Sequence, residues 1–403
     1  MTTAIEHQPL VRGRDIDNDR FDAINKLVTG RGRRGERLLD FSYDMGDVIM
    51  TPRNYVGVIA FRDGDYLEIL PKITDLEDQE SVSKTKRAFL QMLLSAMDID
   101  PAESGLAALD NWRGNPYEFF IGMFLSEVGS IVRQGIRSGY SEVEGNEPFV
   151  RGRILFADDL RLNSSHRERT YQSYQVFGAD RAENRLIRAT LMHLRAISCD
   201  HSNRREIRRL LPHFDGCSDV GEVDAELKGC VVDRNMRHYA RAIRWCDVFL
   251  HGRALSTFSG SEVAYTFLFP MERVFESYVA KTLKSRLEDY DVSVQERGTT
   301  MFDTGLERQV RPDIVIRRGD TALVLDTKWK PIRSNGDITD DDLRQMKEYS
   351  ADFGGEAVLL YPKIRHCEET ESRRGDIVVR TMFLDLLDDL DGWWERIALM
   401  VPD

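Results

Sequence analysis

Cysteine is scarce in this chain of 403 residues: there are five, and no two of them form a Cys-x-x-Cys pair. The eight histidines show no His-Glu-x-x-His or similar ligand spacing. Neither a zinc site nor a disulfide framework is therefore indicated. The N-terminus lacks the apolar core of a signal peptide, and no apolar run approaches about 18 residues. We therefore expect a cytoplasmic protein with no membrane segment.

A nucleotide-binding loop is also missing. The stretch from Gly30 to Arg37 is rich in glycine and arginine, but it lacks the Gly-Lys-Ser/Thr ending of a phosphate loop. We interpret it as a surface loop. If nucleotide hydrolysis drives this system, a partner must carry it out.

The chain also lacks a strong surplus of basic residues. The net charge is −12, whereas a protein that binds DNA on its own usually has a strongly basic face. Only residues 130–260 lean that way, with 21 basic against 17 acidic side chains, a net of +4. We therefore expect a protein that is brought to DNA by a partner.

Two short stretches near the C-terminus carry the most informative pattern, RPDIVI at 311–316 and LDTK at 325–328. Residues 313–318 and 321–328 read as strands joined by a two-residue hairpin turn. Counting back from the turn places Asp313 opposite Asp326. Lys328 lies on the same face, because side chains of a strand alternate with a period of two.

Two opposed carboxylates would repel each other at a separation of about 5 Å. The arrangement makes sense if a divalent metal lies between them, since Mg²⁺ is usually held by one or two carboxylates plus waters and phosphate. Lys328 could then orient the attacking water and offset charge on the phosphate. The pattern predicts a nuclease site. The alternative is an ordinary surface ion pair on a solvated face.

Three neighbouring segments favour the nuclease site. Residues 271–287 have helical apolar spacing, with Glu276 able to face the sheet. A second predicted helix places Gln345 and Tyr349 on one face, and residues 357–361 fit a buried strand. This order of elements resembles the PD-(D/E)xK nuclease fold, in the branch with a Gln-x-x-x-Tyr helix seen in RecB-like enzymes.

Further segments extend the resemblance to about residues 110–365. In collinear order they are NPYEFFIGMFLSEVGSIVRQGIRSGY, EGNEPFVRGRILF, RAENRLIRATLMHL, MERVFESYV, RPDIVI, VLDTKWK and QMKEY. The chain resembles the McrC family, the nuclease subunits of McrBC-type modification-dependent (type IV) restriction systems. The family implies docking on a hexameric AAA+ GTPase of the McrB type, stimulation of its GTP hydrolysis, and cleavage of double-stranded DNA that the partner delivers. GTP is then bound by the partner and not by this chain.

Carried over motif by motif, the resemblance assigns the family's catalytic and supporting positions to Asp313, Asp326, Lys328, Gln345 and Tyr349. The expected Mg²⁺ ligands are Asp313, Asp326 and the carbonyl of Thr327, with Glu276 as a further candidate. Other members have alanine where Thr327 stands, and because both residues are small we expect activity to be retained. We expect no specificity for the modified base in this chain, since nothing resembles a base-flipping pocket.

The predicted fold class is α+β and multidomain, with an N-terminal β-rich and helical docking region before a C-terminal α/β PD-(D/E)xK restriction-endonuclease-like domain. The predicted parts are a β-containing module at 1–110, a mixed hairpin and helical partner-docking domain at 111–260, and the nuclease at 262–403. The stretch 256–261 (STFSGS) is the expected linker. Other predicted elements are a hairpin at 54–61 and 66–70 and helices at 21–28, 85–97, 116–133, 181–214 and 234–252.

Residues 140–156 are the favoured docking segment. We predict two strands there around 144–147, and Arg151 and Arg153 on the second strand could make planar, bidentate contacts at an interface. The alternative is internal pairing of these arginines with the nearby acids Glu147, Asp158 or Asp159.

Two other functions stay open. One is a RecB-like DNA repair nuclease, which the lack of iron–sulfur cysteines and of a helicase segment weakens. The other is a GTPase-activating adaptor with a vestigial nuclease site, against which the intact Asp313, Asp326 and Lys328 argue.

Overall fold

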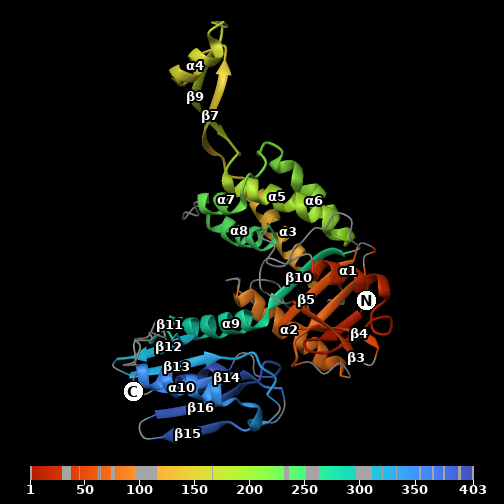
Figure 1. Ribbon diagram of the computed structural model, residues 1–403. Helices are drawn as coiled ribbons and strands as arrows, with labels where there is room; N and C mark the ends of the chain where they lie inside the picture. The colour runs from red at the N-terminus through yellow and green to blue at the C-terminus, as the bar shows by residue number, and fades with distance from the viewer. Residues whose placement is uncertain are drawn as a thin grey trace. The chain divides into compact units, whose positions relative to one another are not determined.

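The fold is that of a mixed α/β protein with several sheets (Figure 1). The computed structural model describes residues 2–29, 38–44, 46–61, 63, 65–73, 78–96, 116–165, 167–230, 236–250, 263–295, 311–319, 321–332, 334–353, 355–364, 367–374, 377–388 and 392–401. The predicted loop at 30–37 and the predicted linker at 256–261 lie outside these residues. Among the described residues, no helix is both long and apolar enough to cross a bilayer.

The chain forms two compact units. The first combines Met1–Arg113 with Phe258–Asp403, and the second is Gly114–Thr257. The predicted N-terminal module at 1–110 and the predicted nuclease domain at 262–403 therefore share one unit. The reason is a strand from the C-terminal part that completes the N-terminal sheet.

That N-terminal sheet has four strands in the order β1-β6-β5-β10. Their bounds are β1 Thr2–Ile5, β5 Tyr55–Phe61, β6 Tyr66–Leu70 and β10 Val263–Pro270. The antiparallel pairing of β5 with β6 confirms the predicted hairpin. β10 pairs with the other side of β5. Gly57 (φ +141°) permits this pairing, because a Cβ there would lie 1.9 Å from the carbonyl oxygen of Phe267.

A smaller sheet and two helices complete the N-terminal part. The sheet has the order β2-β4-β3, and the elements are β2 Leu10–Val11, α1 Asn18–Thr29, β3 Leu39–Asp44, β4 Asp47–Pro52 and α2 Gln79–Ala96. Phe21 and Ile24 of α1 are buried in one core with residues of both sheets. The helix α2 packs against α9, Met271–Arg286, so the N-terminal part and the C-terminal part share a second contact.

The C-terminal part is built on a six-stranded sheet in the order β11-β12-β13-β14-β16-β15. The strands are β11 Asp291–Val294, β12 Ile314–Arg318, β13 Thr321–Thr327, β14 Glu356–Pro362, β15 Thr370–Arg374 and β16 Ile377–Leu384. Arg318 pairs with Thr321 and Ile314 with Leu325, which confirms the predicted hairpin register. The helix α10, Asp340–Phe353, connects β13 to the parallel strand β14.

Both faces of this sheet are covered. Leu323, Val324 and Leu325 follow one another along β13 and are all fully buried. Consecutive residues of a strand point to opposite faces, so helices must shield both. β13 contacts α9 and α10. A polar side chain at the end of β13 is thus held beside a rigid, dry core.

The second unit contains a group of helices. They are α3 Pro116–Gln134, α5 Ala182–Ile197, α6 His201–Leu210, a 3₁₀ turn η2 Leu211–Phe214, α7 Val223–Gly229 and α8 Arg237–Leu250. Tyr117, Phe120, Trp245 and Phe249 form an aromatic core between α3 and α8. The predicted helix at 181–214 divides into α5, α6 and η2, because Asp200 caps α6 by accepting a hydrogen bond from the Asn203 amide.

A β-arm, defined here as residues 139–178, extends from these helices (Figure 1). It consists of β7 Gly139–Glu147, β8 Arg153–Ile154, α4 Phe156–Asn163 and β9 Thr170–Gly178. The segment 140–156 does contain two strands, but the predicted position of the turn between them, 144–147, was wrong. β7 runs straight through those residues and pairs along its whole length with β9, so Glu144 lies opposite Ser173. The expected second strand is only β8, where Gly152 allows close approach to the Ser173 carbonyl.

Candidate active site and docking arm

Asp313 lies directly before β12, and its position is fixed by Thr327 at the end of β13. The Oδ2 of Asp313 accepts hydrogen bonds from the Thr327 amide (2.7 Å) and from the Thr327 hydroxyl (2.9 Å). Sequence reasoning considered only the carbonyl and the small size of Thr327. The hydroxyl adds a second contact that orients the carboxylate.

Asp326 is almost completely buried in β13. Its Oδ2 lies 2.7 Å from Lys328 Nζ, an ion pair outside hydrogen-bond geometry, so this oxygen has no hydrogen-bond donor within the described part of the chain. Burial and then the charge of Asp313 raise the pKa of Asp326 to about 6. Burial alone would lower the pKa of Lys328, but Asp326 and Asp313 raise it above its ordinary value. The structure thus brings the two acids and the lysine together.

Glu276 reaches the same site from α9. Its carboxylate accepts a hydrogen bond from Gln295 Nε2 (2.8 Å), and the Gln295 side-chain oxygen accepts one from Arg311 (2.7 Å). Burial, followed by the charge of Asp313, raises the pKa of Glu276. Gln295 was not singled out from the sequence, because it lies just after an edge strand with no motif around it.

Gln345 and Tyr349 of α10 hold the backbone that leads into the site. The Tyr349 hydroxyl donates to the Arg311 carbonyl (3.1 Å), two residues before Asp313. Gln345 Nε2 donates to the Tyr349 hydroxyl (2.5 Å). Burial, and then the charge of Asp326, raise the pKa of Tyr349 to about 12, so its hydroxyl remains protonated. The pair therefore supports the backbone just before β12.

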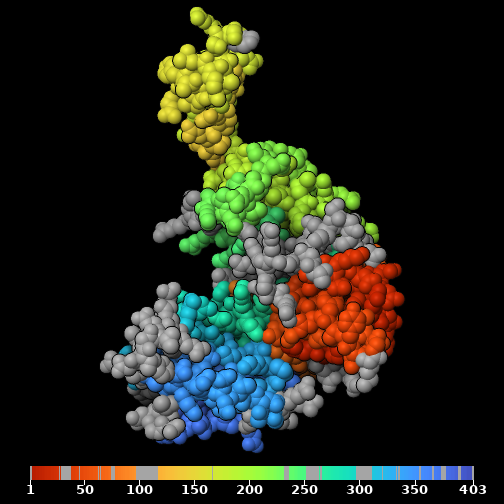
Figure 2. All heavy atoms as spheres, viewed as in Figure 1, coloured from red at the N-terminus to blue at the C-terminus, as the bar shows by residue number. Residues whose placement is uncertain are grey.

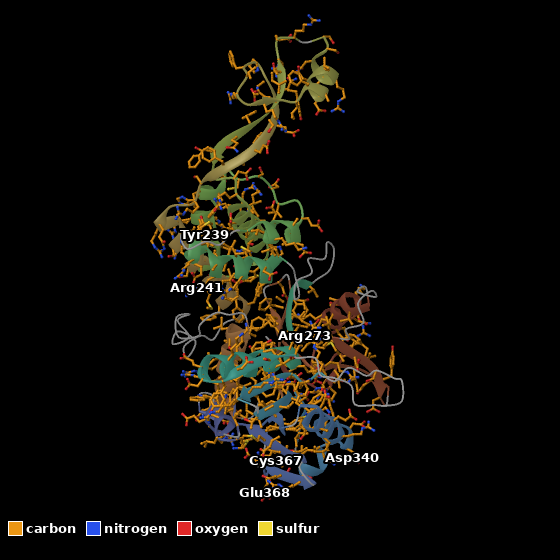
Figure 3. The ribbon with its side chains drawn as sticks, turned by 90° about the vertical axis from the view of Figure 1, so that its left-hand side faces the viewer. Tyr239, Arg241, Arg273, Asp340, Cys367 and Glu368 are labelled. Carbon is orange, nitrogen blue, oxygen red and sulfur yellow. The ribbon has the colours of Figure 1, made fainter. Side chains whose placement is uncertain are left out.

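A second ion pair secures the segment after Lys328. Lys330 Nζ donates to both carboxylate oxygens of Asp342 (2.8 and 2.7 Å), and the Tyr361 hydroxyl donates to Asp342 Oδ2 (3.1 Å). Asp342 belongs to the first turn of α10, whose first residue, Asp340, is labelled in Figure 3. This network was missed from the sequence, where Asp342 reads only as a residue of a helix start.

The donor set suits a cation that keeps most of its waters. No three His, Cys, Asp or Glu side chains of the described residues stand close enough together to hold one metal ion. The charge of Asp313 acts on the buried Asp326 carboxylate, and the Oδ2 of Asp326, 2.7 Å from the Lys328 ammonium, has no donor in hydrogen-bond geometry in that part of the chain. Mg²⁺ commonly takes one or two carboxylates, with water and substrate phosphate as its other ligands. Glu276 as a direct ligand stays a prediction.

Arg151 and Arg153 lie on the arm and are exposed. Among the ion pairs of the described residues, none joins either arginine to the acids considered as internal partners. Those acids have other partners: Asp158 pairs with Arg161, the Glu147 carboxylate accepts from the Tyr174 hydroxyl, and Asp159 accepts from Asn163 and from the Tyr171 amide. Arg151 lies over the ring of Tyr174, 5.6 Å from its centre.

Figure 2 shows the surface of the arm as yellow spheres. Apolar side chains are exposed along the whole arm. They are Tyr140, Val143, Phe149, Val150, Phe156, Leu160, Leu162, Val176 and Phe177. Phe149, Phe156 and Leu160 are each 72% exposed. Contiguous exposed apolar residues mark interaction sites on soluble proteins more often than they mark ordinary surface. The arm therefore has the composition of a docking element.

A family model described as "McrBC 5-methylcytosine restriction system component" matches residues 50–362. The chain belongs to this family. The match spans the β5–β6 hairpin, the arm and the strands with Asp313 and Asp326, so the predicted resemblance is confirmed. No curated protein matches the chain.

Solved structures show the same fold. A chain of the Thermococcus gammatolerans assembly of McrB AAA+ hexamers with bound McrC matches at a TM-score of 0.69 and 22% identity, covering 98% of this chain and 99% of that one. A chain of the cryo-EM structure of the Thermococcus gammatolerans McrBC complex matches at 0.50 and 23% identity, covering 70% and 86%.

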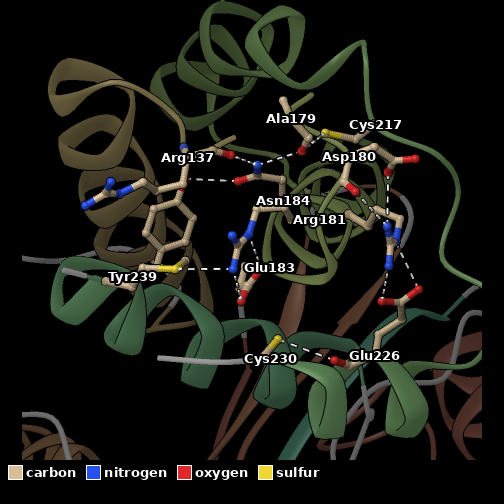
Figure 4. Close-up of polar contacts among 12 residues, drawn as sticks. Arg137, Ala179, Asp180, Arg181, Glu183, Asn184, Cys217, Glu226, Cys230 and Tyr239 are labelled. Atoms are coloured by element: carbon tan, nitrogen blue, oxygen red, sulfur yellow. Dashed lines mark hydrogen bonds and ion pairs between the residues drawn. The ribbon is translucent and has the colours of Figure 1, made fainter. Parts of the chain in front are cut away.

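In this McrBC component, the motif RAENRLI holds the root of the arm (Figure 4). Asn184 donates to the carbonyls of Arg137 (2.9 Å) and Ala179 (2.7 Å), which flank the arm on either side. The Tyr239 hydroxyl donates to Asn184 Oδ1 (3.0 Å) and accepts from the Arg137 amide (2.9 Å). The motif thus anchors both ends of the arm on α5 and α8.

Proposed function

We propose that this chain is the Mg²⁺-dependent DNA endonuclease subunit of a modification-dependent, 5-methylcytosine-type restriction system. It works docked on a hexameric AAA+ GTPase of the McrB type, stimulates GTP hydrolysis by that partner, and acts on double-stranded DNA in the cytoplasm. The observation that carries the proposal is the buried Asp326 with the charge of Asp313 acting on it and Lys328 paired to it, in a chain of the McrBC family. The six-stranded sheet with α9 and α10 supports a PD-(D/E)xK domain.

Asp313 and Asp326 would hold the metal ion, with the Thr327 carbonyl and Glu276 as further candidates. When bound, Mg²⁺ supplies Lewis-acid polarisation of the scissile phosphate and neutralises its charge. The two hydrogen bonds from Thr327 hold the Asp313 carboxylate in one orientation before substrate binds. The burial of Asp326 strengthens every charge interaction there.

Lys328 acts as a fixed positive charge. Its raised pKa keeps the ammonium group protonated at neutral pH, so it donates hydrogen bonds and does not accept a proton. In that state it can hold the attacking water and stabilise the negative charge that develops on the phosphate. Tyr349, supported by Gln345, keeps the Arg311 carbonyl and thus the approach to Asp313 in place.

The arm supplies the docking surface in this proposal. The Thermococcus gammatolerans assembly of the same fold contains McrC bound to McrB AAA+ hexamers. Here the arm offers exposed aromatic residues together with Arg151 and Arg153, which have no acidic partner among the internal candidates. Aromatic and arginine side chains are the residues that dominate binding energy at interfaces. A partner that delivers DNA also explains the net charge of −12.

Reconstitution with a hexameric AAA+ GTPase of the McrB type tests the proposal. DNA with modified cytosines should be cut in Mg²⁺ and GTP, and neither unmodified DNA nor excess EDTA should allow cutting. Cutting that persists in EDTA would refute the metal assignment. End-dependent cutting without a GTPase would instead support a RecB-like repair nuclease, and GTPase stimulation without any cutting would support an adaptor with a vestigial site.

A further inference from the structure

A buried polar trio joins the N-terminal part of the chain to the candidate active site. Glu6 is 3% exposed, Lys72 is 9% exposed and Trp329 is 2% exposed. The Trp329 indole nitrogen donates to both carboxylate oxygens of Glu6 (3.0 and 3.1 Å). Lys72 Nζ donates to the Trp329 carbonyl (2.7 Å) and lies 5.2 Å from the centre of its ring. The Lys72 amide also donates to Glu6 (3.2 Å).

The place of Trp329 in the chain gives this trio its importance. Trp329 directly follows Lys328, and the Lys328 amide donates to the Leu360 carbonyl of β14 (2.9 Å). The Trp329 ring packs on Phe275, with ring centres 5.3 Å apart. Phe275 precedes Glu276 in α9. Trp329 therefore links the two elements that bring charged groups to the site, α9 through its ring and the end of β13 through its place in the chain.

The N-terminal part also holds the start of α9. The Met271 amide donates to the Asn54 carbonyl (2.9 Å), and the Asn54 side chain donates to Glu272 (2.7 Å). The contacts of Asn54 hold the first turn of α9. The trio holds the segment directly after β13. The N-terminal part thus contacts both places.

The trio is expensive to bury. Burial raises the pKa of Glu6 to about 7 and lowers the pKa of Lys72 to about 8. Apolar residues of similar volume often replace a buried ion pair with no loss of stability. A directional polar contact of this kind is therefore better explained by the geometry it imposes than by the stability it adds. Hydrogen bonds to both the side chain and the carbonyl of Trp329 fix the position and orientation of that residue.

We propose that Glu6 and Lys72 are positioning residues for the nuclease, because they fix Trp329 and through it the neighbouring Lys328. The inference rests on the proposed nuclease function. It gives the N-terminal module a role in cutting, so the segment 262–403 alone does not form a working site. It also predicts that a displaced Trp329 impairs cleavage while the arm still engages the partner.

The test uses the full chain with its GTPase partner. Lys72→Met removes the ammonium group but keeps most of the apolar stem, and Trp329→Phe removes the indole donor but keeps an aromatic ring. Each should lower the rate of DNA cleavage at saturating partner and DNA by about tenfold or more, since a misplacement of about 1 Å can cost a hundredfold. Glu6→Gln, whose amide oxygen still accepts from the indole, should lose less.

Lys84→Met is the matched control. Lys84 also links the N-terminal part to the C-terminal part, through Asp388, but this pair is exposed and includes no active-site element. Lys84→Met should therefore cut like the unmodified chain. GTPase stimulation should stay normal in every variant, and cleavage is measured well below each Tm, because Lys72→Met and Trp329→Phe each leave a buried acceptor without its donor and lower stability. Combining Lys72→Met with Trp329→Phe should add little to either change, because the two side chains act as one unit.

Hydrogen exchange gives a second readout that does not depend on activity. Amides of residues 323–332 should exchange faster in Lys72→Met than in the unmodified chain, and Lys84→Met should leave them unchanged. Normal cleavage and normal exchange in a folded Lys72→Met chain would overturn the inference. Absence of cleavage by the unmodified chain would instead refute the proposed nuclease function. The exchange rates would then still show whether Lys72 fixes the segment around Trp329.

Discussion

The β12–β13 hairpin and the β7–β9 hairpin of the arm differ in burial. In the first, consecutive residues such as Leu323 and Val324 are fully buried, and charged groups gather where the strands end. In the second, Tyr140 is 73% exposed and Phe177 is 63% exposed. One hairpin holds carboxylates in a dry site, where small displacements matter. The other offers aromatic side chains and arginines to a surface outside the chain.

The difference separates two kinds of work within one polypeptide. Charge interactions are strong only where water is excluded, so we propose the chemistry for the covered sheet. Binding energy comes from apolar and arginine side chains that lose their water on contact, so we propose docking for the exposed arm. Changes in the covered hairpin should therefore affect cleavage, and changes in the arm should affect the partner.

The largest expected effect is the loss of a carboxylate from the covered hairpin. Asp326→Asn should lower DNA cleavage by about a thousandfold or more, because it removes one of two expected metal-holding charges. Asp291→Asn is the matched control, since Asp291 is an exposed acid on the neighbouring strand β11. Cleavage rates at saturating partner measure the difference. Full activity of Asp326→Asn would show that the catalytic centre lies elsewhere.

The next effect concerns the arm. Arg151→Ala combined with Arg153→Ala should lower stimulation of the partner's GTPase by about tenfold, since exposed arginines at interfaces often contribute more than about 1 kcal/mol each. The melting temperature should not change, because both side chains are exposed. GTP hydrolysis at several chain concentrations measures the effect.

Two exposed arginines of α6 provide the control for this experiment. Arg205→Ala combined with Arg208→Ala removes the same charge from the same unit but leaves the arm intact. Equal loss of stimulation in both double variants would mean that charge in general, and not the arm, attracts the partner.

A smaller effect should follow the loss of one hydroxyl in the covered site. Tyr349→Phe removes the hydrogen bond to the Arg311 carbonyl and should slow cleavage several-fold, since the segment that leads to Asp313 loses a contact worth about 0.5–1.5 kcal/mol. Tyr43→Phe, at an exposed position, should have no effect. Cleavage rates of the two variants at saturating DNA measure the difference. An unchanged rate for Tyr349→Phe would show that Tyr349 does not support the site.

The smallest effect is on stability and depends on pH. The pKa of Glu6 rises from 4.5 to about 7 on burial, so the folded chain binds a proton there more tightly than the unfolded chain. Its contribution to stability is complete below about pH 4.5 and is lost as the pH rises to about 7. Relative to Glu6→Gln, the unmodified chain should lose on the order of 1–3 kcal/mol across that window. Urea unfolding at pH 4.5 and 7.5 measures it, and an equal difference at both values would contradict the shift.

Local patterns were sufficient to predict much of the covered site. The Gly319-Asp320 pair in the sequence predicted the register of β12 and β13, and the pairing of Arg318 with Thr321 confirms it. Counting on from that register predicts Asp313 opposite Asp326. Helical spacing likewise placed Glu276, Gln345 and Tyr349 on the helices that the structure shows. Each of these signals lies within about twenty residues of the group it positions.

Contacts between distant segments could not be predicted. β10 joins β5, and Glu6 contacts Trp329, through pairings that leave no periodic mark in the sequence. The turn in the arm was predicted at the wrong place for the same reason, because β7 pairs with β9, which follows an intervening helix. Gly145 is typical of a turn, although it lies within β7. Hydrophobicity alone does not show which side of a strand is uncovered, so the exposure of the arm's aromatic residues could not be predicted.

The separation of cutting from docking is tested most directly by measuring both activities of one variant, Asp313→Ala, in the same preparation. The account predicts that DNA cleavage disappears while partner binding and stimulation of GTP hydrolysis stay at the level of the unmodified chain. Thermal unfolding confirms that the variant is folded. Loss of GTPase stimulation together with cleavage, in a folded Asp313→Ala chain, would show that the covered hairpin and the arm do not act separately.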